Sequence, residues 1–339
     1  MGIDVNRKRI TIADVAKAAE VSMMTVSRAV NGREGINDET RKRILRIATE
    51  MGYRPSQIAR GLVTHQTATL GLVMPDVANP FFAQIARGAE EAAYQHGYNL
   101  FLINTAEDRE REKRALDSLI EKEIDGAVLC SPRLSQEEML EYLRLLPAVV
   151  LVNREITLKT ESITSLNVDD CRGAEMAVEY LVSKGKKKIA YIAGPESSVS
   201  SQRRLAGYRS GLEAHLLHFD EDCIERCAPT TQGGEEAANR LFARCPNVDA
   251  VLCFNDLVAV GVMRACKQNC LHMPDEVAVI GADDIPLAAL TSPGLTTLHV
   301  DLTAIGEQAM LALLHLIDGS SDSGEKIVIQ PELVVRQSA

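Results

Sequence analysis

The 339-residue chain contains no tryptophan, and only 4% of its residues are aromatic. Platforms of aromatic rings that stack on bases or sugars are therefore not expected to dominate its recognition chemistry. No segment reaches the ~20 consecutive apolar residues that span a membrane. The first ten residues are polar and lack the apolar core of a signal peptide, and eight cysteines are too dilute for a disulfide scaffold. These absences predict a cytoplasmic protein with reduced thiols.

Signatures of common enzymes are also missing. There is no GxGxxG after a predicted strand and no GxxxxGK followed by Ser or Thr, so the chain lacks the usual phosphate cradles. It has neither a GxSxG nucleophile turn nor an HExxH zinc motif. His215, His218, Cys223 and Cys227 are close in sequence, but H-x2-H followed by C-x3-C is not the spacing of a zinc finger or ribbon. We therefore predict no catalytic residues, no metal site and no cofactor.

Charge is unevenly distributed along the chain. Residues 1–66 hold 12 Lys and Arg against 7 Asp and Glu, a net charge of +5. The remaining residues hold 25 (37 − 12) against 40 (47 − 7), a net charge of −15. Only the basic N-terminal segment is therefore expected to contact a polyanion such as DNA.

Residues 1–52 are predicted to form a small helical domain. Thr11, Ser22 and Asn37 are each suited to cap the start of a helix, and apolar residues recur at helical spacing after each of them. Only Glu20 and Val21 separate the first two helices. Three short helices with a tight turn between the first two match the helix-turn-helix plan.

Residues 53–67 are predicted to form a hinge. Pro55 interrupts the preceding helix, and the segment from Ser56 to Val63 offers only about two helical turns, which are marginal in water. Gly61 weakens such a helix by roughly 1 kcal/mol relative to alanine. We expect this segment to become helical only when it is bound to DNA.

Residues 68–339 are predicted to form an α/β body. Strand-like apolar runs alternate with amphipathic stretches, which implies a parallel sheet covered by helices on both faces and, with this many strands, two doubly wound lobes. The predicted strands are 69–74, 98–103, 126–130, 148–152, 189–193, 249–253 and 277–281. The predicted helices are 81–96, 108–122, 135–146, 170–184, 201–216, 234–244 and 255–269. A loop at 319–324 precedes a last predicted strand, 326–335.

Polar residues follow several of these strands. Ligands of open parallel sheets bind outside the carboxyl ends of the strands. Carboxylate, amide and guanidinium groups that converge there suit a polyhydroxylated ligand, because each hydroxyl both donates and accepts. Helix caps also favour Asp, Asn and Ser, so no single position decides between the two roles. The residues concerned are Asp76, Asn153, Arg154, Arg203, Arg204, Asn255, Asp256, Asp283 and Asp284.

Several long segments resemble the lactose/galactose-repressor (LacI/GalR) family. The segment ITIADVAKAAEVSMMTVSRAVNG at 10–32 is similar to the helix-turn-helix of that family, and GYRPSQIARGL at 52–62 is similar to its hinge. The resemblance continues in order through LGLVMPDVANPFF, AGPESSVSSQRRLAGY, FNDLVAVGVMRA, PDEVAVIGADD and SPGLTTLHVD, and so covers nearly the whole chain. It implies a helix-turn-helix head on a body that is similar to periplasmic binding proteins.

The resemblance also implies which residues contact DNA. Met23, Met24 and Arg28 match positions that contact bases in the major groove, although two methionines cannot hydrogen-bond base edges and are suited instead to thymine methyl groups. The methionines could alternatively pack in the core of the head. Residues matched to phosphate contacts and to other parts of the DNA-binding surface are Thr11, Ser22, Thr25, Ser27, Asn31 and Tyr53. In the hinge, Leu62 matches an apolar residue inserted in the minor groove, with Ala59 one turn before it.

In the body, the family's effector site matches Asp76, Asn79, Phe81, Phe82, Arg154, Arg204, Asn255, Asp256 and Asp283. The expected effector is a small sugar or sugar derivative, and a purine or nucleoside is the main alternative because related repressors use one. By resemblance, the first lobe comprises about 68–166 and 298–325, and the second about 167–297 and 326–339. We expect the segment 295–301 to return the chain to the first lobe and the strand 326–335 to belong to the second.

The resulting expectation is a ligand-responsive, dimeric repressor that binds a pseudo-palindromic operator. The helix at 81–96 and the helix after Asn255 are the dimer contacts that the resemblance implies. The chain ends at Ala339 without the heptad tail that makes some members tetramers. A periplasmic sugar-binding protein and a sugar kinase with a regulatory head are the rival functions. The missing signal peptide and basic head disfavour the first, and the missing phosphate cradle disfavours the second.

Overall fold

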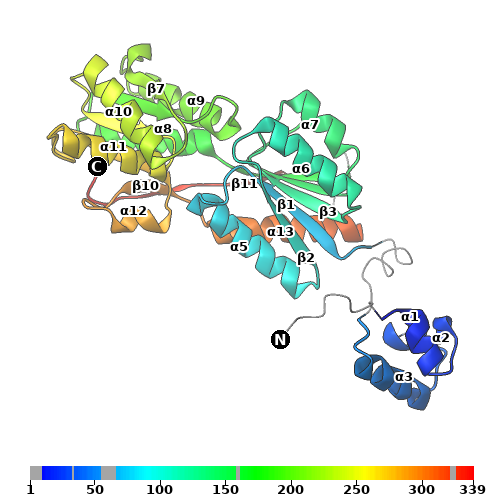
Figure 1. Ribbon diagram of the computed structural model, residues 1–339. Helices are drawn as coiled ribbons and strands as arrows, with labels where there is room; N and C mark the ends of the chain where they lie inside the picture. Colours follow the sequence, from blue (N-terminus) through cyan, green and yellow to red (C-terminus); the bar gives the residue numbers. More distant parts are fainter. Residues whose placement is uncertain (1–9, 33, 55–65, 158–160, 321–325) are drawn as a thin grey trace. The chain divides into compact units, whose positions relative to one another are not determined.

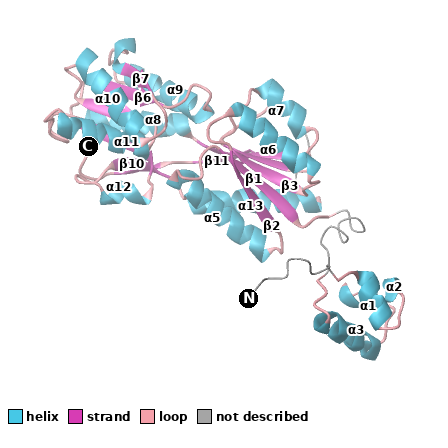
Figure 2. Cartoon of the chain, in the orientation of Figure 1, coloured by secondary structure: helices cyan, strands magenta, loops and turns pink. Residues whose placement is uncertain are grey.

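A computed structural model describes residues 10–32, 34–54, 66–157, 161–320 and 326–339 (Figures 1 and 2). The chain divides into two compact units, Met1–Ala68 and Thr69–Ala339. The first contains a helical head and the second an α/β body with two sheets. The fold class predicted from the sequence is therefore confirmed. Among the described residues, no helix is long and apolar enough to cross a membrane.

The head consists of three short helices around a small apolar core. They are α1 (Ile12–Ala18), α2 (Met23–Val30) and α3 (Asp38–Glu50), capped as predicted by Thr11, Ser22 and Asn37. Glu20 has a φ of 55°, a left-handed conformation that reverses the chain between α1 and α2. The fully buried centre of the head consists of Val15, Val26 and Ile44, one residue from each helix.

The cap of α3 gives a test of head stability. The Asn37 side chain accepts a hydrogen bond from the backbone N–H of Thr40 at 2.7 Å. We expect Asn37→Ala to destabilise α3 by about 1 kcal/mol and to speed amide exchange in its first turn about fivefold. Hydrogen-exchange mass spectrometry of the full chain measures this. The matched Asn37→Asp variant keeps the acceptor and should exchange at the wild-type rate; equal rates in all three proteins would contradict the assignment.

The first lobe is built on a six-stranded parallel sheet in the order β11-β5-β4-β3-β1-β2. Its strands are β1 (Thr69–Met74), β2 (Asn99–Asn104), β3 (Gly126–Cys130), β4 (Val149–Val152), β5 (Ile163–Val168) and β11 (Lys326–Ile329). Its helices are α5 (Pro80–Gln95), α6 (Arg109–Glu121), α7 (Gln136–Leu143) and α13 (Leu302–Asp318). Side chains of β1, β3 and β4 alternate between one core with α5 and α13 and a second core with α6 and α7.

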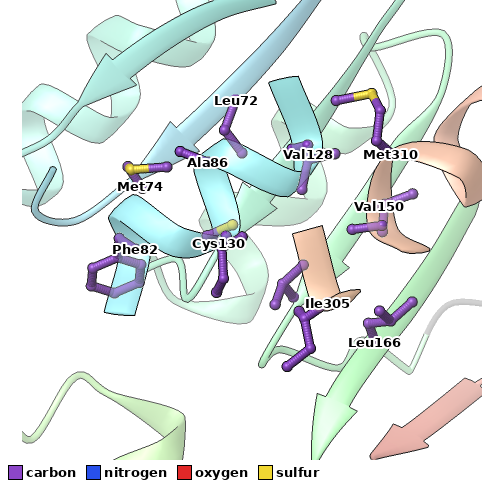
Figure 3. Close-up of a cluster of buried hydrophobic side chains, with 14 of the residues drawn as sticks. Leu72, Met74, Phe82, Ala86, Val128, Cys130, Val150, Leu166, Ile305 and Met310 are labelled. Carbon is purple, nitrogen blue, oxygen red and sulfur yellow. The ribbon is translucent and has the colours of Figure 1, made fainter. Parts of the chain in front are cut away.

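Helices α5 and α13 touch closely where they cross over the sheet. A methyl group on Gly88 would overlap the carbonyl of Thr303, and one on Gly306 would overlap the carbonyl of Ile85. Glycine at both positions therefore lets the two backbones meet, and the paired helices cover the sheet together. Figure 3 shows the resulting core, in which sheet and helix side chains face one another: Leu72, Val128, Val150, Ala86, Ile305 and Met310.

The second lobe repeats this plan with the strand order β12-β10-β9-β8-β6-β7. Its strands are β6 (Ile189–Ala193), β7 (Ile224–Arg226), β8 (Ala250–Cys253), β9 (Ala278–Asp283), β10 (Thr296–His299) and β12 (Glu332–Val334), the last antiparallel to β10. Its helices are α8 (Asp170–Ser183), α9 (Val199–Ala214), the 3-10 turn η1 (Glu221–Cys223), α10 (Thr231–Arg244), α11 (Asp256–Gln268) and α12 (Pro286–Leu290). Helices α8 and α9 cover one face, and α10 and α11 cover the other.

The crossings between the lobes differ from the prediction in two places. The segment 295–301 does not yet return the chain to the first lobe, because β10 pairs with β9 of the second sheet and the crossing follows it. The predicted strand 326–335 is two strands: β11 pairs with β5 in the first lobe, and β12 pairs with β10 in the second. Pro331 separates them, and proline has no backbone N–H for a sheet ladder. The chain therefore crosses between lobes in the middle of the predicted strand.

Candidate ligand cleft and DNA-binding surface

A cavity with about 380 Å³ of empty space, its open mouth included, lies where the strand ends of the two lobes meet. This position is the one expected for ligands of parallel sheets. Its walls come from both lobes. The first-lobe residues that line it are Asn79, Phe81, Phe82, Glu107, Ser131, Arg133 and Asn153. The second-lobe residues are Ser198, Ser200, Arg204, Pro229, Phe254, Asn255 and Asp283.

Arg204 on α9 organises the second-lobe wall. Its Nε donates to Asp170 Oδ1 at 2.7 Å, and its Nη2 donates to Asp283 Oδ1 at 3.1 Å. Its Nη1 donates to the carbonyl of Phe254, whose ring centroid lies 5.3 Å from the guanidinium carbon. The side chain is only 9% exposed. A buried guanidinium held at three nitrogens is rigid, so the polar surface that it presents with Asp283 is preorganised.

Asp283 combines burial with an unusual backbone. Burial raises the pKa of its carboxyl to about 7, although the neighbouring Arg204 charge lowers it. A carboxyl that exchanges its proton near neutral pH can accept a hydrogen bond from a ligand hydroxyl or donate one to it. Its φ is 107°, which is rare for a residue with a side chain.

Two further residues at strand ends in the cavity have positive φ: Ser131 after β3, at 46°, and Asn153 after β4, at 57°. Backbone strain of this kind concentrates at ligand sites, where the surrounding fold holds it in place. Ser200 adds a buried hydroxyl for which the described residues provide no hydrogen-bond partner. The cavity thus contains a polar atom that a ligand can satisfy.

The first-lobe wall is aromatic on one side and charged on the other. The rings of Phe81 and Phe82 meet edge to face, with centroids 4.9 Å apart and planes at 89°. Asn79 caps α5 by accepting from the N–H of Phe81, and this places both rings at the start of the helix. On the charged side, the guanidinium of Arg133 forms a two-pronged ion pair with Glu107.

Six of the nine predicted ligand residues line the cavity: Asn79, Phe81, Phe82, Arg204, Asn255 and Asp283. The other three, Asp76, Arg154 and Asp256, are not among the described residues that line it. Arg154 Nη2 donates to the carbonyl of Leu134, and Asp76 Oδ1 accepts from the N–H of Ala78. These contacts serve local structure.

Asp256 is fully buried and has a role inside the second lobe. It accepts from the Thr297 hydroxyl at 2.6 Å and from the N–H of Ile285 at 2.8 Å. Burial, followed by the nearby Asp283 charge, raises its pKa well above the usual range. It ties α11 to β10, while its neighbour Asn255 lines the cavity.

Several residues that line the cavity were not among the nine predicted ligand residues. Asn153 was identified at a strand end, and Ser131, Ser198 and Ser200 also follow strands, so the strand-end rule pointed to their neighbourhood. Glu107 and Arg133 follow β2 and β3 in the same way, but their pairing joins residues 26 positions apart. No motif or spacing in the sequence indicated that Phe254 and Pro229 would line the cavity.

On the head, the predicted base-contacting residues form an exposed surface at α2. Met23 is 56% exposed and Met24 is 65% exposed, so neither packs in the head core. Arg28 is also exposed on this helix. Large apolar side chains at this exposure are available to a partner.

The remaining predicted DNA contacts have local roles in the head. Thr11 forms a capping box with Asp14, Ser22 accepts from the N–H of Thr25, and Asn31 donates to the Ser27 carbonyl. Tyr53 packs against the head core. Ala59 and Leu62, the predicted hinge contacts, lie outside the described residues. All of these DNA-contact assignments stay predictions.

Among the described residues, Cys223 and Cys227 do not form a cluster of metal ligands with His215 and His218. The Cys223 sulfur lies 3.2 Å from that of Cys245 and 3.5 Å from Asp220 Oδ2. Burial raises the pKa of Cys223 to about 12, so its thiol is protonated at neutral pH. Asp220, Cys223 and Cys245 offer ligand atoms within 4.8 Å of one another, so the absence of a metal site stays a prediction.

Comparison with known proteins decides between the regulator and its rivals. Residues 11–56 match the model for "Bacterial regulatory proteins, lacI family", and residues 67–337 match "Periplasmic binding proteins and sugar binding domain of LacI family". The chain belongs to the LacI family. It is therefore a ligand-responsive transcriptional regulator, with a DNA-binding head and a ligand-binding body.

Relatives cover nearly the whole chain. The "HTH-type transcriptional repressor CytR" of Escherichia coli (strain K12) is 34% identical over 331 residues, which are 97% of this chain and 96% of the relative. The lac repressor dimer bound to operator and the anti-inducer ONPF matches with a TM-score of 0.86 and 26% identity, over 98% of this chain and 99% of that one. A transcriptional regulator CelR–cellobiose complex matches with a TM-score of 0.74 and 28% identity, over 98% of this chain and 100% of that one.

Proposed function

We propose that this LacI-family regulator is a dimeric repressor whose affinity for a pseudo-palindromic operator changes when a small sugar or sugar derivative binds in the cleft. The cavity between the strand ends carries the proposal, because both lobes line it and its polar wall combines Arg204 with Asp283. A ligand that touches both lobes favours one closure state of the body. If it binds that state about 100 times more tightly, the coupling free energy is roughly 2.7 kcal/mol.

The shape of the aromatic wall favours a sugar over a purine. A flat base stacks best between parallel faces, whereas the Phe81 and Phe82 planes stand at 89°. One ring face next to one ring edge suits the apolar C–H surface of a pyranose or furanose. The mixed partners on the opposite wall, Asp283, Asn255 and Ser200, match hydroxyl groups that donate and accept.

Dimerisation follows from the small reading surface of one head. A single helix-turn-helix module offers too little surface for specific binding, and two-fold proteins pair with two-fold sites. The body exposes apolar side chains that suit such contacts: Tyr94 on α5 is 73% exposed, and Phe101 on the edge strand β2 is 44% exposed. The protein acts in the cytoplasm, where it meets DNA, and its role is regulation rather than catalysis.

Operator titration tests this function. Thermal-shift screening of sugars, nucleosides and bases identifies the ligand, since a ligand at 100 times its dissociation constant stabilises the protein by roughly 2.7 kcal/mol. Gel shifts on DNA upstream of the gene then measure operator affinity with and without that ligand. A stabilising ligand that leaves operator affinity unchanged would overturn the coupling, and a purine among the hits in place of a sugar would favour the alternative.

Met24 gives a test of base recognition. We expect Met24→Gln to lose its preference for thymine over uracil at the contacted position, by about 1 kcal/mol, the value of one buried methyl group. Competition gel shifts with single-base operator variants measure this preference. The exposed Leu45 on α3 provides the control, because Leu45→Gln should leave it unchanged. An unaltered preference in Met24→Gln would remove the methyl contact.

A further inference from the structure

Among the described residues, four charged side chains line the cleft, two arginines and two carboxylates. They are Glu107 and Arg133 in the first lobe, and Arg204 and Asp283 in the second. Each guanidinium already has a carboxylate partner in the described structure. The net charge that the cleft presents to a ligand therefore depends on whether both arginine–carboxylate pairs stay intact.

Arg133 is almost fully engaged by its own lobe. Its Nε and Nη2 donate to the two oxygens of Glu107 at 2.6 and 3.0 Å, and its Nη1 donates to the Ser131 carbonyl at 2.6 Å. The guanidinium side chain is only 4% exposed, while Glu107 is 25% exposed. Glu107 thus occupies the planar fork with which an arginine would bind a phosphate.

Arg204 is engaged in the same way, with an additional carboxylate behind it. Asp170 binds its Nε, and the side chain of Asp170 is only 1% exposed. Together with Asp283, this places two carboxylates on one guanidinium. The charge of Arg204 is therefore compensated within the second lobe and offers little net attraction to an anionic ligand.

Helix N-termini are a further source of positive potential at the cleft. Helices α5, α9 and α11 begin there, and each has a side-chain cap. Asn79 accepts from the N–H of Phe81, Ser198 from that of Ser201, and Asn255 from that of Val258. Each cap occupies one of the N–H groups that are free at the start of its helix and so leaves fewer of them for a phosphate.

We propose that the cleft selects an uncharged ligand and that Glu107 is the residue that excludes phosphate esters, because it occupies Arg133. This inference rests on the proposed function for the site itself and goes beyond it by naming the charge class of the ligand. A phosphate entering the cleft would have to compete with Glu107 for the Arg133 fork and would lie beside the displaced carboxylate. Replacing that carboxylate by a neutral amide removes the competitor and leaves a buried cation open to anions.

Inorganic phosphate tests the inference without knowledge of the natural ligand. Isothermal titration of the full-length protein, at constant ionic strength, compares wild type with Glu107→Gln. Glutamine has the same shape and can still accept from Arg133, so the fold should be kept. We expect Glu107→Gln to bind phosphate at least about tenfold more tightly than wild type. Equal affinities, or tight phosphate binding by wild type, would overturn the proposal.

Glu138→Gln is the matched control. Glu138 pairs with Arg109 and Lys113 in the same lobe, but it does not line the cleft. Its replacement also releases two cations, and every variant carries the same basic head. We therefore expect phosphate affinity at the wild-type level, and a gain equal to that of Glu107→Gln would show a surface effect and contradict the cleft assignment.

Matched pairs of neutral compounds and their phosphate esters separate this inference from the proposed function. Ribose with ribose 5-phosphate, glucose with glucose 6-phosphate, and adenosine with its monophosphate form such pairs. Wild type should bind no ester more tightly than its neutral partner. An ester that binds better and changes operator affinity would overturn the inference and leave the regulator intact. A neutral compound that binds in the cleft without changing operator affinity would overturn the proposed function and leave the inference about ligand charge intact.

Discussion

Arg204→Ala should abolish the effect of the ligand on operator binding and lower the free energy of unfolding of the body by about 3–5 kcal/mol. The substitution removes the group that joins Asp170 to Asp283 and leaves two buried carboxylates without their cation. The head forms a separate compact unit, so operator affinity without ligand should stay near that of wild type. Urea unfolding measures the stability, and operator titration with and without the ligand found by screening measures the response.

Two controls separate the loss of stability from the loss of response. Arg204→Lys keeps a positive charge next to the carboxylates but loses the planar guanidinium with its several N–H donors. It should therefore recover part of the free energy of unfolding and little of the response to ligand. Arg203→Ala removes the adjacent arginine, whose partly exposed ion pair with Glu155 should contribute less than about 1 kcal/mol. If Arg204→Ala still responds at the wild-type ligand concentration, Arg204 is not part of the effector site.

Arg28→Ala should weaken operator binding by about 1–3 kcal/mol, roughly 5- to 150-fold in affinity, if Arg28 makes a bidentate contact with guanine. The side chain is exposed on α2, beside the surface formed by Met23 and Met24. A base contact is lost only on the specific sequence, so binding to random DNA should change much less. Fluorescence anisotropy on operator and on random duplexes at one fixed salt concentration measures both.

Arg46→Ala is the matched control for that measurement. Arg46 is an exposed arginine on α3 of the same head, 3.9 Å from Glu50. It carries the same charge but lies outside the predicted recognition helix, so operator preference over random DNA should be retained. An equal loss on operator and random DNA in Arg28→Ala would show that Arg28 contacts only phosphate.

Much of the fold follows from local sequence patterns. The head helices start at Thr11, Ser22 and Asn37 because a side-chain oxygen there satisfies a free N–H within three residues. Continuous apolar runs such as 69–74 and 249–253 predicted buried parallel strands, since both faces of such a strand are covered. The polar strand β5 (Ile163–Val168) and the helix α13 (Leu302–Asp318) were missed. Thr164, Ser165 and Asn167 break the apolar run of β5.

The candidate site was predicted only in part. Strand ends indicated the correct edge of each sheet, but adjacent residues there point in different directions. Asn255 lines the cavity, while the next residue, Asp256, turns into the second lobe to bind Thr297. The strand-end rule selects both and does not separate them, because the direction of a side chain depends on the backbone of its own turn.

The sequence by itself determined the family, the basic head, the alternation of strands and helices, and the strand ends at which ligands bind. These features depend on composition and on neighbours within a few positions. Only the tertiary structure decided that Arg133 pairs with Glu107, that Arg204 joins Asp170 to Asp283, and that the chain crosses between lobes at Pro331. Those contacts join residues 26 to 79 positions apart or depend on which sheet has a free edge, and no local pattern records such distances.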